Sequence, residues 1–312
     1  MTGTRNRCRV VLLAACVLAI FAGTLFAQAR ATYLYTLSNF SGKLRYDWVR
    51  VRVDRERDEI YVLYQNLVRI FSPSGMEVFS FGDDLDLGQI VDAEVDANGD
   101  IILLSFKDGR SQVTRCNFRG VPIGPIEIRN LPEGLTFYAN RMILRNGLLY
   151  FASLATSSVI VTDTNGEFRR HIEFLPLIEA TENEKAGAET VGFTVDRDGS
   201  IYFSIPALFK VFKYSPDGKL GFFGRPGSAA GRFGILGGVA IDSRGNVLVA
   251  DKLKCVVMVF DKDFKFLVEF GYRGAKPQNL VVPDDVAVDG RDRLYVSQGR
   301  RRGVSVFALT GE

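Results

Sequence analysis

The single histidine, His171, sets the first limit on the chemistry that this sequence could perform. A zinc site built from several histidines needs more than one, and so does an H-E-x-x-H helix. A Ser-His-Asp hydrolase would depend on His171 alone, which lies on a strand that we predict to be the outermost of its sheet. The four cysteines show no C-x-x-C or C-x-x-C-H spacing, which argues against zinc ribbons, thioredoxin-type motifs and covalent haem. We therefore expect no catalytic residues and no cofactor.

Three carboxylates, Asp92, Asp284 and Asp285, are the remaining candidates for acid–base or metal chemistry. Carboxylates hold a metal ion or transfer protons in a reaction only when the fold brings several suitable groups together. Their chemistry therefore depends on the elements that position them.

Those elements come from an internal repeat. Six copies share an alternating apolar strand, a polar turn and a second strand: VRVDRERDEIYVLY, AEVDANGDIILLS, MILRNGLLYFAS, FTVDRDGSIYFS, VAIDSRGNVLVAD and VAVDGRDRLYVSQ. Equivalent positions, at the end of the first strand of each copy, lie 42 to 51 residues apart: Asp54, Asp96, Arg145, Asp196, Asp242 and Asp289. This period, with short strands and frequent turn signals, is typical of four-stranded propeller blades. No segment shows sustained helical periodicity.

We predict an all-β fold over residues 30–312, a six-bladed β-propeller with four antiparallel strands in each blade. The sixth copy breaks off after its third strand, because the chain ends at Glu312 just past Phe307. The N-terminal strand Thr32–Leu37 is expected to complete this last blade. Closure of the ring in this way leaves the terminal blades without exposed edges.

Within this architecture the strand-ending aspartates are expected to form turns, since Asp accepts hydrogen bonds from backbone amides two residues further along. Asp92, Asp284 and Asp285 fall at the starts of innermost strands, near one mouth of the central channel. The fourth and fifth blades have Gly192 and Gly238 there and contribute no ligand. We therefore expect no metal site, and a site built on Asp92 and Asp285 is the alternative.

Two cysteines, Cys116 and Cys255, belong to blades two and five. These blades face each other across a six-fold ring. The distance exceeds the roughly 7 Å between Cα atoms that a disulfide can span, so we expect no bridge between them.

Charge is unevenly distributed among the loops that join the blades and those that join second to third strands. The chain has 39 Lys and Arg against 36 Asp and Glu, and Arg5, Arg7 and Arg9 account for the whole excess. A neutral body argues against nucleic-acid binding. The loops of blades five, six and one carry a basic sector, whose candidate partner-binding residues are Arg300, Arg301, Arg302, Lys252, Lys254 and Arg273. The loops that enter blades two and four are acidic: Asp83, Asp84, Asp86, Glu179, Glu182, Glu184 and Glu189.

These charges have two readings: solvated loop charge, or a recognition surface for an acidic partner. Three consecutive arginines in one short loop are expected to project into solvent, because burial of unpaired charge is costly.

Residues 1–29 resemble a targeting segment. Residues 1–9 are polar and basic, residues 10–27 are apolar, and Ala27-Gln28-Ala29 supplies the small residues that a signal peptidase reads. The apolar run could also span a bilayer as an uncleaved anchor. Leu13-Ala14-Ala15-Cys16 resembles a bacterial lipoprotein box in which Cys16 would be acylated. All three readings predict export of residues 30–312 to the periplasm, the cell surface or the extracellular space.

The fifth copy, GSAAGRFGILGGVAIDSRGNVLVADKLKCVVMVFDKDFKFLVEFG (Gly227–Gly271), is similar to the NHL repeat. That pattern runs from a glycine-rich lead through a G-V-A-V-D strand and an N-I-Y-V-A-D strand to a V-F-D end. The sixth and fourth copies match less closely, and the first three only in skeleton. The resemblance implies an exported bacterial six-bladed propeller. Lys254-Cys255-Val256 stands where the family's Asn-His-Arg would fall, so no function of those letters carries over.

The family resemblance also extends to enzymes. Six-bladed sugar-lactone hydrolases place several carboxylates around a metal, and amidating lyases carry a zinc-bearing propeller that requires several histidines. This chain has only His171.

The function we expect is a non-catalytic binding or scaffolding module of the bacterial cell envelope, which recognises a protein partner with an acidic surface. One alternative is a hydrolase or lyase that uses Asp92 and Asp285 at the channel mouth. The other is an accessory subunit of an envelope redox complex, because NHL-like propellers also serve as such companions. Membrane contact is expected only through the N-terminal segment, if that segment is retained or lipidated.

Overall fold

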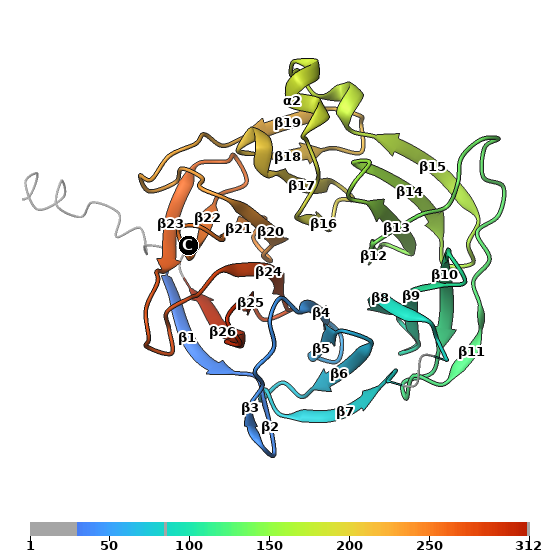
Figure 1. The fold of residues 1–312 in the computed structure, drawn as a ribbon, viewed down its shortest axis with the longest axis horizontal. Helices are drawn as coiled ribbons and strands as arrows, with labels where there is room; N and C mark the ends of the chain where they lie inside the picture. Colours follow the sequence, from blue (N-terminus) through green and yellow to red (C-terminus); the bar gives the residue numbers. More distant parts are fainter. Residues whose placement is uncertain (1–29, 84–85, 311–312) are drawn as a thin grey trace, which may run out of the picture.

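Six four-stranded antiparallel sheets surround a common axis in the computed structural model, which describes residues 30–83 and 86–310 (Figure 1). The predicted all-β, six-bladed propeller is confirmed. In each blade the four strands follow one another from the axis outwards, with the first strand innermost.

The strands of the first three blades follow the chain in order. Blade 1 contains β4 (Arg50–Asp54), β5 (Glu59–Tyr64), β6 (Leu67–Phe71) and β7 (Glu77–Phe81). Blade 2 contains β8 (Gln89–Val95), β9 (Ile101–Lys107), β10 (Arg110–Cys116) and β11 (Pro122–Pro125). Blade 3 contains β12 (Arg141–Arg145), β13 (Leu148–Ser153), β14 (Ser158–Asp163) and β15 (Phe168–Glu173).

The last three blades have the same layout. Blade 4 contains β16 (Phe193–Val195), β17 (Ile201–Ile205), β18 (Lys210–Tyr214) and β19 (Leu220–Phe223). Blade 5 contains β20 (Leu236–Ile241), β21 (Val247–Asp251), β22 (Val256–Phe260) and β23 (Phe266–Gly271). Blade 6 contains β24 (Pro283–Val288), β25 (Arg293–Gln298), β26 (Gly303–Thr310) and β1 (Arg30–Thr36).

Short elements occupy some of the connections. A hairpin of β2 (Ser38–Asn39) and β3 (Gly42–Lys43) precedes blade 1, and η2 (Pro206–Leu208) joins β17 to β18. The connection from blade 3 to blade 4 contains η1 (Leu175–Leu177) and α2 (Glu182–Ala186). Within the described part of the chain no helix is long and apolar enough to cross a membrane. The targeting segment proposed for residues 1–29 lies outside the described residues.

The hydrophobic core is divided among the interfaces between neighbouring blades. The middle strands are apolar on both faces: β17, β21 and β22 are buried along their whole length. This is expected of a strand covered by another sheet on each side. Each of the six buried clusters in the described chain joins residues of two adjacent blades. No blade therefore has a core of its own.

The ring closes through the pairing of β1 with β26, as the incomplete sixth repeat predicted. The Tyr33 ring packs edge-on against Phe307, with the ring centroids 5.8 Å apart. Tyr35 donates a hydrogen bond from its hydroxyl to the Pro73 carbonyl in blade 1, at 2.8 Å. Leu37 is fully buried in the cluster between blades 6 and 1. The N-terminal strand thus completes one blade and binds the next.

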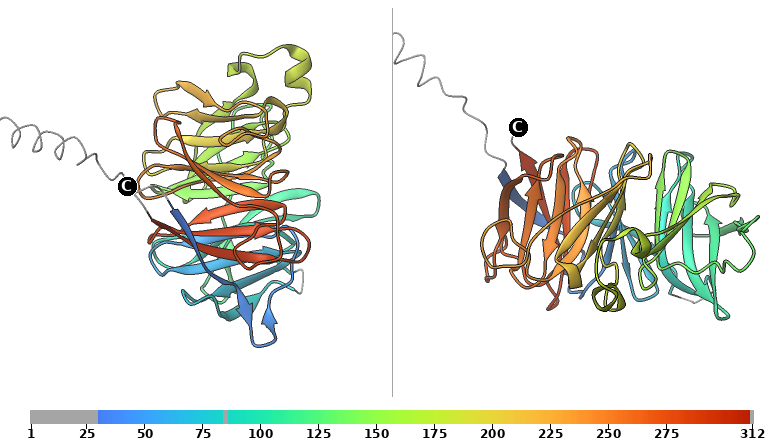
Figure 2. Two further views of the ribbon diagram at one scale, coloured as in Figure 1. Left: turned by 90° about the vertical axis from the view of Figure 1, so that its left-hand side faces the viewer. Right: turned by 90° about the horizontal axis from the view of Figure 1, so that it is seen from above.

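The two faces of the ring carry different connections (Figure 2). The loop face bears the connections between blades and those between second and third strands, including α2. The turn face bears the turns that join first to second and third to fourth strands, and β26 ends on that side. These two names are used below.

Deletion of residues 31–40 should destabilise the protein by several kcal/mol, because it opens the edge of β26 and removes the buried Leu37. Thermal unfolding followed by circular dichroism measures the effect. A melting temperature within a degree or two of the intact chain would show that β1 does not close the ring.

Candidate functional site

The innermost strands place charged side chains along the central channel. A narrow space of about 60 Å³ is lined by residues of β4, β8, β12, β16, β20 and β24, with Arg52 and Glu94 among them. This space is the part of the structure in which the candidate carboxylates Asp92 and Asp285 were expected to act.

A guanidinium group already occupies the place between these carboxylates. Arg52 of β4 lies 2.6 Å from Asp92, 3.5 Å from Glu94 and 3.8 Å from Asp285, measured between guanidinium nitrogens and carboxylate oxygens. Although burial alone would lower it, the three neighbouring carboxylates raise the pKa of Arg52 above its ordinary value. The positive charge in this part of the channel is therefore a fixed side chain.

Asp92 does not lie at an open mouth, as the sequence suggested, but is fully buried partway along β8. Because strand β8 begins at Gln89, three residues earlier, Asp92 lies within the strand and forms part of the channel wall. Its Oδ2 accepts hydrogen bonds from Arg52 and, at 2.8 Å, from the Met142 backbone. Its Oδ1 accepts one from the Ala93 backbone at 3.0 Å. Both oxygens are thus engaged.

A second arginine, Arg50, supports the same carboxylate. It lies 3.4 Å from Asp92 and donates to the carbonyls of Val91 and Asn140, which belong to blades 2 and 3. Arg50 and Arg52 therefore join blade 1 to its neighbours through buried, charge-assisted hydrogen bonds.

Asp285 and Asp284 are also engaged by neighbouring groups. The Val51 backbone donates to Asp285 at 3.2 Å, and Lys252 forms an ion pair with Asp284. Within residues 30–83 and 86–310, no three His, Cys, Asp or Glu side chains are grouped so that they could hold a metal ion.

Gly192 and Gly238 stand at the equivalent positions because neighbouring inner strands pack there in close contact. A Cβ on Gly192 would lie 2.6 Å from the Gly237 carbonyl oxygen, and one on Gly238 would lie 2.9 Å from the Val286 backbone nitrogen. Any larger side chain would force these strands apart.

The strand-ending aspartates form turns, as predicted. In each case Oδ1 accepts a hydrogen bond from the backbone of the residue two positions on, for Asp54, Asp96, Asp196, Asp242 and Asp289. Blade 3 is the exception, because Arg145 stands at this position.

The basic sector is partly used to hold the loops in place. Arg300, Arg301 and Arg273 are exposed. Lys252 pairs with Asp284, and Lys254 lies 2.9 Å from Glu269. The expectation that all three consecutive arginines project into solvent is wrong for Arg302, which is half-buried. Its guanidinium donates to the carbonyls of Lys276 and Asn279, because the loop from blade 5 folds over it.

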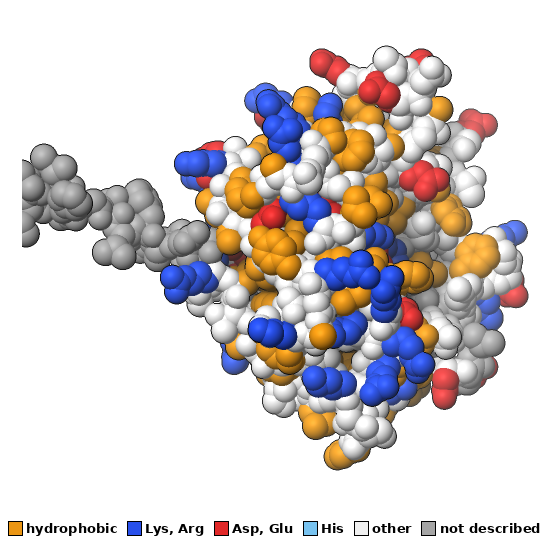
Figure 3. Space-filling view, turned by 60° about the vertical axis from the view of Figure 1, so that its left-hand side comes forward, with side chains coloured by type: hydrophobic (Ala, Val, Ile, Leu, Met, Phe, Trp, Pro, Cys, Tyr) orange, Lys and Arg blue, Asp and Glu red, His pale blue; other side chains and the backbone are white. Residues whose placement is uncertain are grey.

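Large apolar side chains are exposed on the same face, in loops of blades 1 and 5. Trp48, Leu253 and Tyr272 expose 62%, 66% and 53% of their surface. The Arg301 backbone donates to Asp47, which precedes Trp48. Figure 3 turns blades 5, 6 and 1 towards the viewer and shows basic and apolar side chains interspersed there. The charges of this surface were predicted from the sequence, and its apolar residues were not.

One of the acidic loops contains the N-terminus of helix α2, which is closed by a capping box. Thr181 caps α2, and Glu184 accepts hydrogen bonds from the backbone and hydroxyl of Thr181. One predicted acidic residue, Asp84, lies outside the described residues.

His171 lies on β15, the outermost strand of blade 3, where it pairs with Ile160. Cys116 and Cys255 are both free and buried, and they lie in blades 2 and 5.

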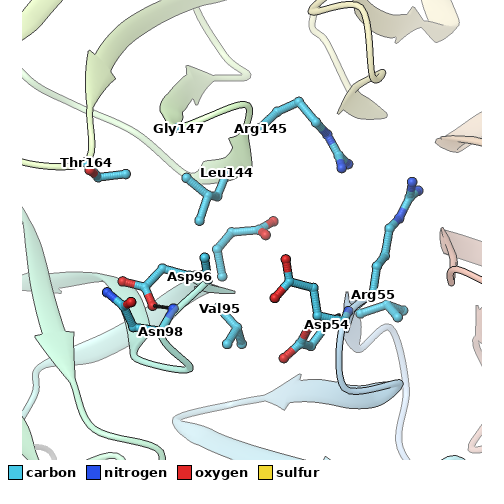
Figure 4. A pocket seen from close by; sticks show the side chains of 13 residues that line it. Asp54, Arg55, Val95, Asp96, Asn98, Leu144, Arg145, Gly147 and Thr164 are labelled. Atoms are coloured by element: carbon cyan, nitrogen blue, oxygen red, sulfur yellow. Dashed lines mark hydrogen bonds between the residues drawn. The ribbon is translucent and has the colours of Figure 1, made fainter.

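At the turn face the channel widens into a cavity of about 430 Å³ (Figure 4). Arg55 and Arg145 line it and point towards one another, from blades 1 and 3. Glu94 lines both this cavity and the narrow space, as do Arg55 and Arg145. Burial of this carboxyl raises its pKa to about 7, against the opposing effects of Arg52, Arg145 and a hydrogen bond from the Leu144 backbone.

Neither arginine is among the site residues predicted from the sequence. For Arg145 a signal was present, since it replaces the aspartate found at this position in the other five copies.

Comparisons with known proteins agree on the fold. No family model matches the sequence. Protein brain tumor of Drosophila melanogaster is 35% identical over 92 residues, which are 29% of this chain and 9% of that protein. This chain therefore corresponds to a small part of that relative.

Three solved structures illustrate the structural likeness. A catalytically inactive histidine-to-alanine variant of virginiamycin B lyase from Staphylococcus aureus, with quinupristin, is 13% identical, with a TM-score of 0.56 over 86% of this chain and 84% of that one. An auxiliary nutrient binding protein from Bacteroides thetaiotaomicron is 11% identical, with a TM-score of 0.61 over 91% and 77%. A luciferin-regenerating enzyme is 13% identical, with a TM-score of 0.59 over 91% and 95%. The chain has the six-bladed propeller fold that these enzymes and binding proteins share.

Replacement of Arg52 by Met should lower the free energy of unfolding by about 3–5 kcal/mol, because it leaves Asp92 buried with less compensation. Denaturant unfolding measures the loss. Asp92→Asn in the Arg52→Met background should recover part of it, and a loss below about 1 kcal/mol would contradict the role given to this pair.

The raised pKa of Glu94 predicts a specific dependence of stability on pH. An unfolded Glu titrates near pH 4.3, so between about pH 4.5 and 7 the folded state binds more protons. The stabilising contribution of the protonated Glu94 carboxyl is therefore complete below the pKa of the unfolded chain. It is lost as pH rises through the folded-state pKa of about 7. Relative to Glu94→Gln, the wild type should lose about 2 kcal/mol from pH 5 to 8 in denaturant unfolding. Parallel curves for the two proteins would refute the raised pKa.

Proposed function

We propose that residues 30–312 form a non-catalytic binding propeller, which engages a protein partner with an acidic surface through the loop face. The observation that carries this proposal is the ion-pair cluster of the channel. Arg50 and Arg52 neutralise Asp92 and Asp285, the carboxylates on which a hydrolase or lyase of this chain would have to rely.

The histidine content supports the same conclusion. A structural neighbour, virginiamycin B lyase, is described as catalytically inactive when one histidine is replaced by alanine. The lone histidine of this chain, His171, lies on the outermost strand of blade 3 and does not line the channel space or the cavity at the turn face.

The composition of the loop face supports binding. Trp, Tyr and Arg carry much of the energy of protein interfaces, and Trp48, Tyr272, Arg300 and Arg301 are exposed together there. We call these four residues the aromatic–arginine patch. Trp48 and Tyr272 have φ angles of 50° and 49°, a left-handed backbone conformation that costs free energy for bulky residues. Such strain at exposed aromatic residues favours a role in recognition.

Positive charge on this patch should mainly accelerate association with an acidic surface. The apolar N-terminal segment resembles an export signal or membrane anchor. We therefore infer that the partner of this patch belongs to the bacterial cell envelope. The nutrient-binding neighbour shows that a propeller of this shape can serve in binding.

Arg300→Ser combined with Arg301→Ser should leave unfolding within about 0.5 kcal/mol of wild type, since both side chains are exposed. Its association rate with the partner captured from the native envelope should fall at least about tenfold at low salt and converge with wild type at high salt. Surface plasmon resonance measures both rates.

The matched control is Arg169→Ser with Arg170→Ser, which removes two adjacent charges from β15 on the outer edge of blade 3. Wild-type kinetics are expected for this variant. If the patch variant also keeps wild-type affinity and salt dependence, the arginines only solvate their loop and the proposal fails.

A further inference from the structure

We propose that the cavity at the turn face is a binding site for a small solute that carries several negatively charged oxygens, such as a phosphate or a tricarboxylate. Arg55 and Arg145 would bind it. This site lies at the end of the channel opposite the loop-face surface and is independent of the protein-partner proposal.

The first observation is the convergence of two arginines that form no ion pair among the described residues, although Glu94 interacts with both at longer range. Arg55 reaches from blade 1 to the Ile241 carbonyl of blade 5, at 3.4 Å. Arg145 donates to the Val195 carbonyl of blade 4, at 3.2 Å. Among the described residues neither guanidinium forms an ion pair, although both are half-buried. Each therefore retains N–H donors for a ligand.

The second observation is that positive charge is concentrated here against its own repulsion. Burial and the charges of Arg145 and exposed Arg197 lower the pKa of Arg55 to about 10. Arg197 does not line the cavity but lies in the turn between β16 and β17, on the same face as Arg55 and Arg145. A bound anion would relieve this repulsion, because an opposite charge nearby stabilises each cation.

The acidic residues around the cavity do not cancel this charge. Asp54 and Asp96 line it, but they are paired with Arg57 and Arg115. Two carboxylates remain, Glu56 at the exposed rim and Glu94 at the floor.

The floor carboxylate adds little opposing charge. The pKa of Glu94 is raised to about 7, so near neutral pH this side chain is only partly ionised, and Arg52 lies 3.5 Å from it. The two guanidinium groups of Arg55 and Arg145 therefore outweigh the charge of Glu56 and of the partly ionised Glu94.

The third observation is the size and lining of the cavity. Its volume of about 430 Å³ is within the range of small-molecule sites in proteins. Asn98 and Thr164 line it together with the arginines and offer neutral polar groups (Figure 4). Guanidinium groups bind carboxylate and phosphate through paired hydrogen bonds, so both kinds of oxyanion fit the arginines.

The repeat itself provides a clean test. Aspartate occupies the position of Arg145 in the other five blades. In blade 3 the turn is shorter and is formed by Asn146 and Gly147, both with left-handed backbone, so it does not depend on the side chain at position 145. Arg145→Asp should therefore fold, and it reverses the charge at this position. Arg55→Gln removes the second guanidinium and introduces no negative charge.

Isothermal titration calorimetry with the intact chain should detect saturable binding of inorganic phosphate, of citrate or of both, at constant ionic strength. Arg55→Gln should weaken binding at least tenfold, and Arg145→Asp should abolish it. Binding of phosphate alone would identify a phosphate-bearing solute, and binding of citrate alone a polycarboxylate. Arg300→Ser with Arg301→Ser on the other face should bind like wild type.

Two results would overturn the site. One is the absence of saturable binding of either anion up to millimolar concentration. The other is equal binding by wild type and Arg145→Asp, with circular dichroism showing that both are folded. Loss of binding in the Arg300→Ser/Arg301→Ser variant instead would place the anion on the loop face. The two proposals can fail separately, because anion binding depends on Arg55 and Arg145 and partner binding depends on Arg300 and Arg301.

Discussion

The pairing of β1 with β26 closes the ring and so holds the six blades together. Every hydrophobic cluster is shared by two blades, so a blade contributes to stability only when both neighbours are present. An open ring would expose the edge of β26 and the apolar residues against which Leu37 packs. Closure also brings blade 6 beside blade 1, which is how Asp285 reaches Arg52.

Arginine residues have different roles along the channel because their partners differ. In the inner part, Arg50 and Arg52 are surrounded by carboxylates and backbone carbonyls, and they hold blades together. At the turn face, Arg55 and Arg145 each meet a single backbone carbonyl and keep unused donors. A buried charge is tolerated where it is paired, and an unpaired one is retained only at a cost. This contrast separates the structural arginines from those that can serve a ligand.

The two faces of the ring are suited to different kinds of partner. The loop face presents exposed aromatic and arginine side chains on loops of neighbouring blades, which fits a protein surface. The turn face presents a partly open cavity with converging cations, which fits a small anion. The channel between them is narrow and filled by the Arg52 cluster, so the two sites are physically separate.

The blades could be predicted from the amino-acid sequence alone, because their signals are local. The repeated aspartate turns, the alternating strands and the missing strand of the sixth copy are read within stretches of a few residues, and they predicted the order of the strands and the closure by β1. The run of three consecutive arginines also indicated the exposure of Arg300 and Arg301. The environment of each channel side chain was decided only by the tertiary structure. Asp92 meets Arg52 from another blade, Asp285 meets it across the closed ring, and Arg302 is covered by a loop of blade 5. Whether a carboxylate is free to act depends on which charge lies beside it, and in a propeller that neighbour comes from a distant part of the chain.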